Sequence, residues 1–562
     1  MEPTSSPFLN ADRLLLGPWQ AFERDVARLM IHNGFGDVKV VGGTGDRGAD
    51  VLGTKDGQLW VLQCKHTTTS GPPPTAVDEV VEAGRAYKAD RILVAVSRPP
   101  GDSFLSEIRR YERQGLHVEV LPPAALLQLM EASPEFPPTM NTLRPYQRLA
   151  AEALKQCLID TGRGLVVLAT GLGKTVVMAE IVSELFREGL VEHGRAIVLA
   201  HTHEIVSQLH RSFWHQLPKW VQTQQLTGVE MPQTWSGLTF STFQSIVPNA
   251  DALPSFGLVL VDEAHHIGAE SFQRAIELLR PKMLGGVTAT PWRGDGFDIE
   301  SLLGHPLMQI GIADGLSQGY LSEVDYRMYA DNIDWAYVQE CSTNRYTVSQ
   351  LNRKLLIPTR DDEAAKEIRS TFDHEKTRCG IVFCPTLAHA NAICGHLRRY
   401  NLRAESISGE MSARERELLL SRLRNGQLHF IASVDLFNEG VDVPDVDLIV
   451  FMRATHSRRI FVQQLGRGLR ITADKKRVVV QDFVTDVRRI AEVLHLDSGV
   501  RSGPVESVGL GAHLVNFRNE AAGPFVRKWM LDQASLILRE GDAQLEMPKF
   551  NYPPPEPPGN VQ

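Results

Sequence analysis

Short apolar runs followed by helically spaced apolar positions recur along most of the chain. Gly164–Leu168 is a continuous apolar run, which is typical of a strand buried on both faces of a parallel sheet. It leads through a glycine-containing turn into Val176–Phe186, where apolar residues recur at helical spacing. Similar runs predict buried strands at Ala196–Ala200 and Leu258–Val261. This alternation of strand and helix predicts an α/β protein with parallel sheets.

The N-terminal part of the chain has a different order of elements. Trp19, Phe22, Val26 and Leu29 recur at helical spacing, so Pro18–Asn33 is predicted to be an amphipathic helix. The elements after it complete the order αβββαβαβ, with strands at Val38–Val41, Ala49–Thr54 and Leu59–Lys65, a helix at Ala76–Tyr87, a strand at Arg91–Val96, a helix at Ser103–Arg113 and a strand at His117–Leu121.

The hairpin in this N-terminal part is predicted to bring three polar side chains together. Asp56-Gly57 is a strong signal for a two-residue turn, and this turn fixes the register so that Asp50 faces Gln63. Gln63 and Lys65 are two residues apart in one strand, so both point to the same face. An acid, an amide oxygen and a lysine at one point can hold Mg²⁺ and activate a water for attack on a phosphodiester.

A glycine-rich loop joins the predicted strand Gly164–Leu168 to the predicted helix Val176–Phe186. Its sequence is Leu168-Ala169-Thr170-Gly171-Leu172-Gly173-Lys174-Thr175. Glycines let backbone N–H groups close around phosphate oxygens, and the helix N-terminus adds positive potential. The strict form of this loop has glycine where Leu168 stands. We expect an ATP site formed by Thr170, Gly171, Leu172, Gly173, Lys174 and Thr175, with Lys174 on the β/γ-phosphates and Thr175 on Mg²⁺.

Further polar residues follow other predicted strands of the same sheet. Asp262 and Glu263 come directly after a buried strand, where a carboxylate can hold the Mg²⁺ of a nucleotide. Asp262 is expected to bind this ion, and Glu263 to position and deprotonate the attacking water. Gln147 precedes the first strand and can read adenine through its amide. The segment Thr288-Ala289-Thr290-Pro291 follows one strand later and can link the nucleotide state to the bound nucleic-acid strand.

A second series of strands and helices begins near Gly311. It ends with a predicted helix that carries Arg467 and Arg470 three residues apart, so both lie on one face. Two such arginines can reach the γ-phosphate across a cleft. The expected elements before this helix are strands at Gly380–Cys384, Phe430–Val434 and Leu448–Met452 and a helix at His389–Tyr400.

From Leu143 to about Asp482 the chain resembles a superfamily 2 helicase or translocase of the DEAH type, with two RecA-like lobes. The resemblance implies ATP and Mg²⁺ as cofactors and single- or double-stranded DNA as a partner. Thr290–Gly296 resembles the subgroup of type I restriction motors and bacterial repair helicases, and Gly440 and Asp442 would be further ATP contacts. The matched segments, in the order of the family, are Leu168–Thr175, Asp262–His265, Thr288–Thr290, Ser433–Asp442 and Gln463–Arg470.

The N-terminal hairpin resembles the Mrr-type branch of the PD-(D/E)xK nucleases. Gly48-Ala49-Asp50 and Gln63-Cys64-Lys65 match the two signatures of this branch, and Phe22-Glu23 matches the acid of its first helix. The resemblance implies that Asp50 and Gln63 bind metal, that Lys65 is catalytic and that Glu23 assists. Glutamine replaces the second acid of the wider family.

These resemblances give the expected fold class and domain order. The fold class is α/β, with a restriction-endonuclease-like αβββαβ domain followed by two RecA-like parallel-sheet lobes. Prolines interrupt helices and sheets, so the proline clusters at 122–123 and 134–138 place the domain boundary there. The expected parts are a nuclease-like domain (1–122), a proline-rich linker (123–141), a first ATP-binding lobe (142–308), a second lobe (309–498), and a C-terminal helix with a disordered tail (499–562).

The composition of the chain indicates its cellular compartment and the way in which it would bind nucleic acid. The net charge is −8, so DNA must be bound through local basic patches rather than a global field. We see no signal peptide and no membrane span, and the six cysteines are scattered, which indicates a reducing, cytoplasmic protein. Cys379, Cys384 and Cys394 lack paired spacing and are more typical of buried core cysteines than of zinc ligands.

The sequence therefore predicts an ATP-dependent DNA translocase or helicase with a Mg²⁺-dependent endonuclease domain. Fusions of this kind often serve defence against foreign DNA, and homo-oligomers or defence partner proteins are possible. Two alternatives stay open. One is a repair helicase whose first domain binds DNA without cutting, and the other is an ATP-controlled nucleic-acid-binding switch. Glu263, Arg467 and Arg470 favour hydrolysis over a pure switch.

Overall fold

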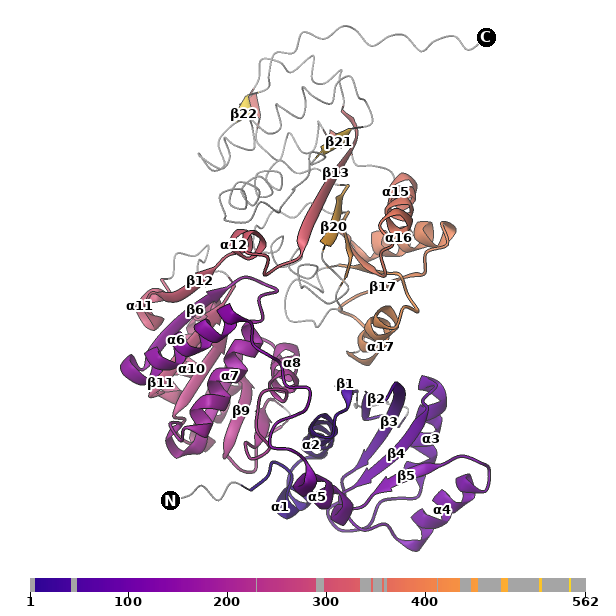
Figure 1. The fold of residues 1–562 in the computed structure, drawn as a ribbon, viewed down its shortest axis with the longest axis vertical. Helices are drawn as coiled ribbons and strands as arrows, with labels where there is room; N and C mark the ends of the chain where they lie inside the picture. Colours follow the sequence, from indigo (N-terminus) through magenta and orange to yellow (C-terminus); the bar gives the residue numbers. More distant parts are fainter. Residues whose placement is uncertain are drawn as a thin grey trace. The chain divides into compact units, whose positions relative to one another are not determined.

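The computed structural model divides the chain into two compact units, which we describe separately (Figure 1). Unit 1 comprises 1–169, 173–310 and 440–442, and unit 2 the remainder. Several predicted features lie outside the described residues: Arg467, Arg470, Gly440, Asp442, Thr290–Gly296 and all of 499–562 except 515–517 and 545–546. The structure describes residues 6–41, 48–228, 230–289, 298–333, 345–346, 356–357, 361–411, 413–434, 446–452, 477–483, 515–517 and 545–546.

The N-terminal domain is a five-stranded sheet with helices on both faces, and it confirms the predicted αβββαβαβ order. The strands lie in chain order, antiparallel from β1 to β3 and parallel from β3 to β5. The elements are α1 (Ala11–Leu15), α2 (Trp19–His32), β1 (Gly36–Val40), β2 (Val51–Lys55), β3 (Gln58–Lys65), α3 (Thr75–Tyr87), β4 (Arg91–Val96), α4 (Asp102–Glu112), β5 (Val118–Leu121) and α5 (Pro123–Ala132).

Alternate strand residues of this domain form two hydrophobic clusters, one on each face of the sheet. Val51 and Leu62 pack with α2, whereas Leu52 and Val61 pack with α3 and α4. This alternation follows from the two-residue period of a strand. The leucine-rich piece that we placed in the linker forms α5, and its buried side chains complete the α2 cluster.

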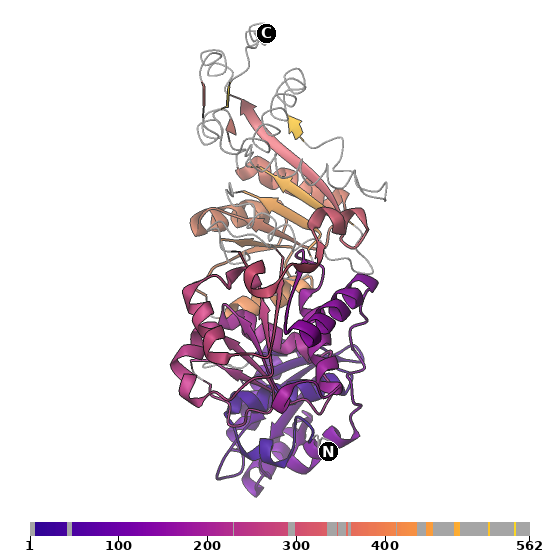
Figure 2. The same cartoon turned by 90° about the vertical axis from the view of Figure 1, so that its left-hand side faces the viewer.

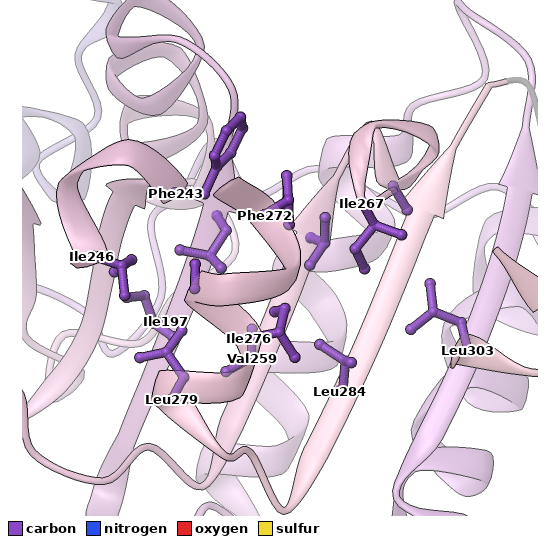
Figure 3. Close-up of a cluster of buried hydrophobic side chains, with 14 of the residues drawn as sticks. Ile197, Phe243, Ile246, Val259, Ile267, Phe272, Ile276, Leu279, Leu284 and Leu303 are labelled. Atoms are coloured by element: carbon purple, nitrogen blue, oxygen red, sulfur yellow. The ribbon is translucent and has the colours of Figure 1, made fainter. Parts of the chain in front are cut away.

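The first lobe is a seven-stranded parallel sheet in the order β12-β6-β11-β10-β7-β9-β8. Its ribbons are coloured from purple to magenta in Figure 2. In Figure 3, Phe272, Ile276 and Leu279 of α10 lie against sheet residues that include Val259 and Leu284. The main elements are α6 (Pro145–Thr161), β6 (Arg163–Leu168), α7 (Lys174–Arg187), β7 (Arg195–Ala200), α8 (His203–Phe213), β8 (Thr223–Leu226), β9 (Gly237–Thr242), β10 (Leu258–Asp262), α10 (Glu270–Leu279), β11 (Met283–Thr288) and β12 (Pro306–Ile310).

Short helical turns fill the connections of this lobe. They are η1 (Glu192–Gly194), α9 (Phe243–Ile246), η2 (Val247–Ala252), η3 (Ala264–His266) and α11 (Glu300–Leu303).

Unit 2 contains a second sheet, in the order β15-β13-β20-β19-β16-β18-β17, with β21 also paired to β13. All of these pairs are parallel except β13 with β15. Cys384 and Cys394 lie in its apolar core. The elements are α12 (Ile312–Ser317), β13 (Glu323–Ile333), β15 (Leu356–Ile357), α15 (Asp361–His374), β16 (Gly380–Phe383), α16 (Leu387–Arg399), β17 (Ala404–Ile407), α17 (Ala413–Arg424), β18 (Phe430–Ser433), β19 (Leu448–Phe451), β20 (Arg477–Asp482) and β21 (Val515–Phe517), with a separate pair of β14 (Arg345–Tyr346) and β22 (Leu545–Glu546).

The two parallel sheets confirm the predicted fold class. The expected strands at 380–384, 430–434 and 448–452 are present as β16, β18 and β19, each one residue shorter at its end. No helix among the described residues is both long and apolar enough to cross a membrane.

One fully buried histidine makes unit 1 sensitive to acid. His32 is the last residue of α2, and its ring Nδ1 lies 3.2 Å from the Pro134 carbonyl oxygen. Its Nε2 has no hydrogen-bond partner among the described residues. Burial, and then the nearby charge of Arg28, lower the pKa of His32 to about 3. The neutral ring is therefore strongly preferred in the folded protein.

We predict that His32→Gln reduces the loss of stability on acidification. In the unfolded chain this histidine protonates near its ordinary pKa of about 6.5, whereas in the folded protein it protonates near 3. Between these values the unfolded state binds more protons, so the free energy of unfolding falls as the pH falls. The contribution is about 2 kcal/mol at pH ~5. Between neutral pH and pH ~5, the free energy of unfolding in urea should fall less in His32→Gln than in the parent, by about this amount.

The control is His117→Gln, because the His117 side chain is 69% exposed. An equal pH dependence of unfolding in the parent and in His32→Gln would contradict the prediction.

Candidate nuclease and nucleotide sites

The glycine-rich loop follows β6 and has the backbone conformation that only glycine adopts readily. Gly171 has φ +92° and Gly173 has φ +81°. A Cβ atom added to Gly173 would lie 2.4 Å from Nε2 of Gln147. The Gln147 amide therefore lies directly against the loop. Its Oε1 accepts a hydrogen bond of 2.9 Å from the Arg144 backbone N–H.

Lys174 and Glu263 form an ion pair at the ends of two strands of one sheet. Lys174 is the first residue of α7, and its Nζ lies 3.3 Å from Oε1 of Glu263, which follows β10. Both side chains are largely buried, with 11% and 17% of their surface exposed. Thr175 lies in the same first turn of α7 and is half-buried.

Glu263 adopts a strained backbone conformation that aims its side chain at Lys174. Its φ is +49° and ψ is +54°, in the left-handed region that few non-glycine residues adopt. Such strain is typical of functional positions. Burial alone would raise the pKa of Glu263, but the charge of Lys174 and the hydrogen bond from His265 outweigh it and lower that pKa. Glu263 is therefore an anion here.

Asp262 offers an oxygen atom that fits a cation. It ends β10 and is 8% exposed, and its Oδ1 has no hydrogen-bond partner among the described residues. Burial, followed by the charge of Glu263, raises the pKa of Asp262. A buried carboxylate oxygen without a donor is costly unless a cation or a proton meets it. The Asp262 oxygen is therefore of the type that a hard divalent ion takes.

A hydrogen bond links the nucleotide site to the strand that follows. His265 Nδ1 lies 2.8 Å from Thr288 Oγ1 at the end of β11, and 3.3 Å from Glu263 Oε2. Both His265 and Thr288 are buried. This contact joins Glu263 to the segment that we expected to communicate with nucleic acid. The sequence placed Thr288 near the site but did not identify His265 as its partner.

In the N-terminal domain the predicted hairpin register is confirmed. Strand β2 pairs with β3 so that Lys55 faces Gln58 and Val51 faces Leu62. Asp50 and Gln63 consequently meet, and Gln63 Nε2 donates a hydrogen bond of 2.7 Å to Asp50 Oδ2. The same oxygen accepts a bond of 2.6 Å from the Cys64 N–H.

The amide of Gln63 leaves its oxygen available for a metal ion. Gln63 is 2% exposed, and its Oε1 has no hydrogen-bond partner among the described residues. Asp50 is equally buried, and Glu23 on α2 is 5% exposed. After burial, the charges of Asp50 and Glu23 are the largest causes that raise the pKa of the Cys64 thiol, so both carboxylates lie near it. Carboxylate and amide oxygens are the ligands that divalent cations prefer, but the described residues contain no group of three or more His, Cys, Asp or Glu side chains placed to hold a metal ion.

Lys65 has a partner that the sequence did not reveal. Its Nζ lies 2.7 Å from Glu79 Oε2 on α3, and the two side chains are 25% and 42% exposed. A Cβ atom on Gly48, which has φ +86°, would lie 2.4 Å from the backbone of Glu79, so α3 packs tightly beside this hairpin. The only sequence signal was an acid in a predicted helix, which does not indicate a long-range contact.

Comparison with known families matches three segments of the chain. Residues 17–130 match a family described as "Restriction endonuclease" (Mrr type), and residues 140–293 match "Type III restriction enzyme, res subunit". Residues 363–472 match "Helicase conserved C-terminal domain".

Similar proteins match about three fifths of the chain. The putative mitochondrial ATP-dependent helicase irc3 of Schizosaccharomyces pombe is 28% identical over 375 residues, covering 63% of this chain and 59% of the relative. The DNA 3'-5' translocase XPB2 of Sulfurisphaera tokodaii is 24% identical, covering 60% of this chain and 81% of the relative. The chain thus spans little more than half of some relatives that it matches.

A solved structure shares the fold over most of the chain. The DNA-bound ATP-dependent Type ISP restriction-modification enzyme LlaBIII superposes with a TM-score of 0.52 at 16% identity, covering 91% of this chain and 41% of that one. The chain thus carries an N-terminal segment that matches a restriction endonuclease family, followed by two segments that match the type III restriction res-subunit and helicase C-terminal families.

Proposed function

We propose that this protein is an ATP-dependent DNA helicase or translocase that carries a Mg²⁺-dependent DNA endonuclease domain. The observation that carries the proposal is the Lys174–Glu263 ion pair beside the unpartnered Asp262 oxygen. A lysine, a catalytic carboxylate and a metal-binding carboxylate at the ends of parallel strands are what nucleotide hydrolysis requires.

The ion pair suggests how ATP turns on hydrolysis. Lys174 pairs with Glu263. A triphosphate in the loop would attract the Lys174 ammonium to its β- and γ-phosphates, which weakens this pairing. Glu263 would then be free to orient a water molecule and accept its proton. Asp262 and Thr175 would hold Mg²⁺, which supplies charge stabilisation to the phosphates when bound.

Motion along DNA requires a second lobe that responds to this site. The proposed cycle closes the two lobes on DNA when ATP is bound and reopens them after hydrolysis. The buried His265–Thr288 hydrogen bond supports a route from Glu263 to the DNA-binding segments. Arg467 and Arg470 remain our candidates for the arginine finger.

The hairpin supports phosphodiester cleavage by the first domain. Asp50 and the Gln63 Oε1 atom would hold Mg²⁺, which lowers the pKa of a bound water when present. Glu23 would assist, and Lys65 would steady the developing negative charge. Glu79 pairs with Lys65, and a DNA phosphate would compete for the same ammonium.

The biological role that we propose is defence against foreign DNA in the cytoplasm. The restriction-enzyme families matched at both ends of unit 1 support it. The repair-helicase alternative requires a first domain that binds without cutting, and the orphaned Gln63 oxygen argues against that. The switch alternative requires no water activation, and the ionised, strained Glu263 argues against that.

We predict that Glu263→Gln binds ATP but hydrolyses it at least ~100-fold more slowly, because an amide cannot accept the proton of the water. DNA-stimulated phosphate release and binding of a fluorescent ATP analogue should be measured on the same preparation. Lys174→Ala serves as the comparison, since it should lose affinity as well as turnover. Failure of Glu263→Gln to bind nucleotide would mean that its role is structural.

We predict that Gln63→Ala raises the Mg²⁺ concentration needed for cleavage by ~10–100-fold, because a ligand oxygen is lost. Gln63→Glu keeps an oxygen at this position and should cut at Mg²⁺ concentrations near those of the parent. The measurement is nicking of supercoiled plasmid across a Mg²⁺ titration. Parental nicking by Gln63→Ala at low Mg²⁺ would remove Gln63 from the proposed metal site.

A further inference from the structure

Helix α2 carries a residue of the nuclease site and, beside it, charged residues that contact the first lobe. Glu23 belongs to the nuclease site, whereas Arg24 and Arg28 are bound by residues around strand β8. The helix is thus shared by two domains of unit 1, and the residues that contact each other here are 190 to 206 positions apart in the sequence.

Arg28 is the most deeply buried charge at this contact. The whole residue is 0% exposed, and its guanidinium donates hydrogen bonds of 2.7 Å to the Val221 carbonyl and 2.9 Å to the Pro218 carbonyl. It also lies 4.0 Å from the centre of the Phe8 ring. The Phe8 N–H in turn donates a bond of 2.7 Å to the Lys219 carbonyl. The first lobe therefore supplies the backbone acceptors that a buried arginine needs.

Two ion pairs flank Arg28. Arg24 of α2 bonds to Glu230 of the first lobe, and both side chains are nearly buried, with 11% and 6% exposed. Arg13 pairs with Asp25 at 3.1 Å and donates a bond of 3.1 Å to the Thr223 carbonyl in β8. Buried charges of this kind persist only where their partners are fixed, because an unpaired one would favour exposure to water.

Apolar and capping contacts extend the same surface. Trp214 of the first lobe is 1% exposed and belongs to the hydrophobic cluster of the N-terminal domain. Lys219 Nζ donates bonds of 3.0 Å and 2.7 Å to the carbonyls of Glu131 and Ser133, at the C-terminal end of α5. A cation at this end also compensates the helix dipole. Charge, shape and backbone hydrogen bonds thus all join the two domains.

We infer that the nuclease domain and the first motor lobe are one rigid body, docked through α2, and that they stay docked in every nucleotide state. The nuclease site then travels with the first lobe, and the lobe holds in place the helix that carries Glu23. The inference depends only on the contacts, and not on whether the domain cuts DNA.

The Arg24–Glu230 pair allows a test by charge reversal in the full-length protein. Arg24→Glu and Glu230→Arg each place like charges together in a buried site, whereas the double variant restores an opposite pair. Hydrogen–deuterium exchange should be followed at the amides of Phe8 and Lys219, which donate backbone bonds at the contact. Each single variant should accelerate their exchange by roughly tenfold or more, and the double variant should recover most of that protection.

A matched control and a milder variant separate undocking from unfolding. Arg110→Glu reverses a charge on an exposed pair with Asp78 and should not change exchange at Phe8 or Lys219. Glu230→Gln removes a charge without repulsion and should give a smaller increase. In every variant, the amides of the first-lobe core strands β10 and β11 should keep parental protection. The docking role of this pair would be overturned if each single variant exchanged at the parental rate. It would also be overturned if the double variant exchanged as fast as the single variants.

The claim of one rigid body is tested with the same measurement in different nucleotide states. The Phe8 and Lys219 amides should keep the same protection without nucleotide, with ADP, and with DNA and a non-hydrolysable ATP analogue. Loss of protection at these amides in any one state would show that the nuclease domain undocks during the cycle and would refute the inference.

Discussion

The Lys174–Glu263 ion pair depends on the parallel arrangement of the first-lobe sheet. Strands β6, β11 and β10 are neighbours and run in one direction, so the residues after their C-terminal ends gather at one edge. Residues almost ninety positions apart in sequence thereby meet at 3.3 Å. The left-handed backbone of Glu263 costs on the order of 1 kcal/mol, and the ion pair and the hydrogen bond from His265 offset it. The proposed ATPase cycle requires this geometry.

Features fixed by local sequence could be predicted, and those fixed by distant contacts could not. The Asp56-Gly57 turn sets the hairpin register, so the meeting of Asp50 with Gln63 followed from the sequence alone. The positive φ angles at Gly171 and Gly173 are likewise local requirements of the loop. The Lys65–Glu79 pair depends on how α3 packs, which no periodicity encodes.

The same difference between local and distant contacts explains why the residues between the two domains were predicted to be a linker. Their prolines indicated a linker, but the apolar side of α5, with Leu126 and Met130, completes the core of the first domain. From the sequence alone, Arg28 is indistinguishable from an ordinary charged residue on the exposed face of an amphipathic helix. Only the three-dimensional structure shows that the carbonyls of Pro218 and Val221 accept hydrogen bonds from its guanidinium. Domains that seem independent in sequence therefore share one helix and one buried surface.

The central claim is that one chain holds two separate chemistries, cutting at the hairpin and ATP hydrolysis at the loop. The most direct measurement pairs plasmid nicking with DNA-stimulated phosphate release on the same preparations of Asp50→Ala and Lys174→Ala. The account predicts that Asp50→Ala loses Mg²⁺-dependent nicking and keeps its ATPase, whereas Lys174→Ala loses its ATPase. Nicking by Asp50→Ala at the parental rate would contradict the claim, because the hairpin would then not be a catalytic site.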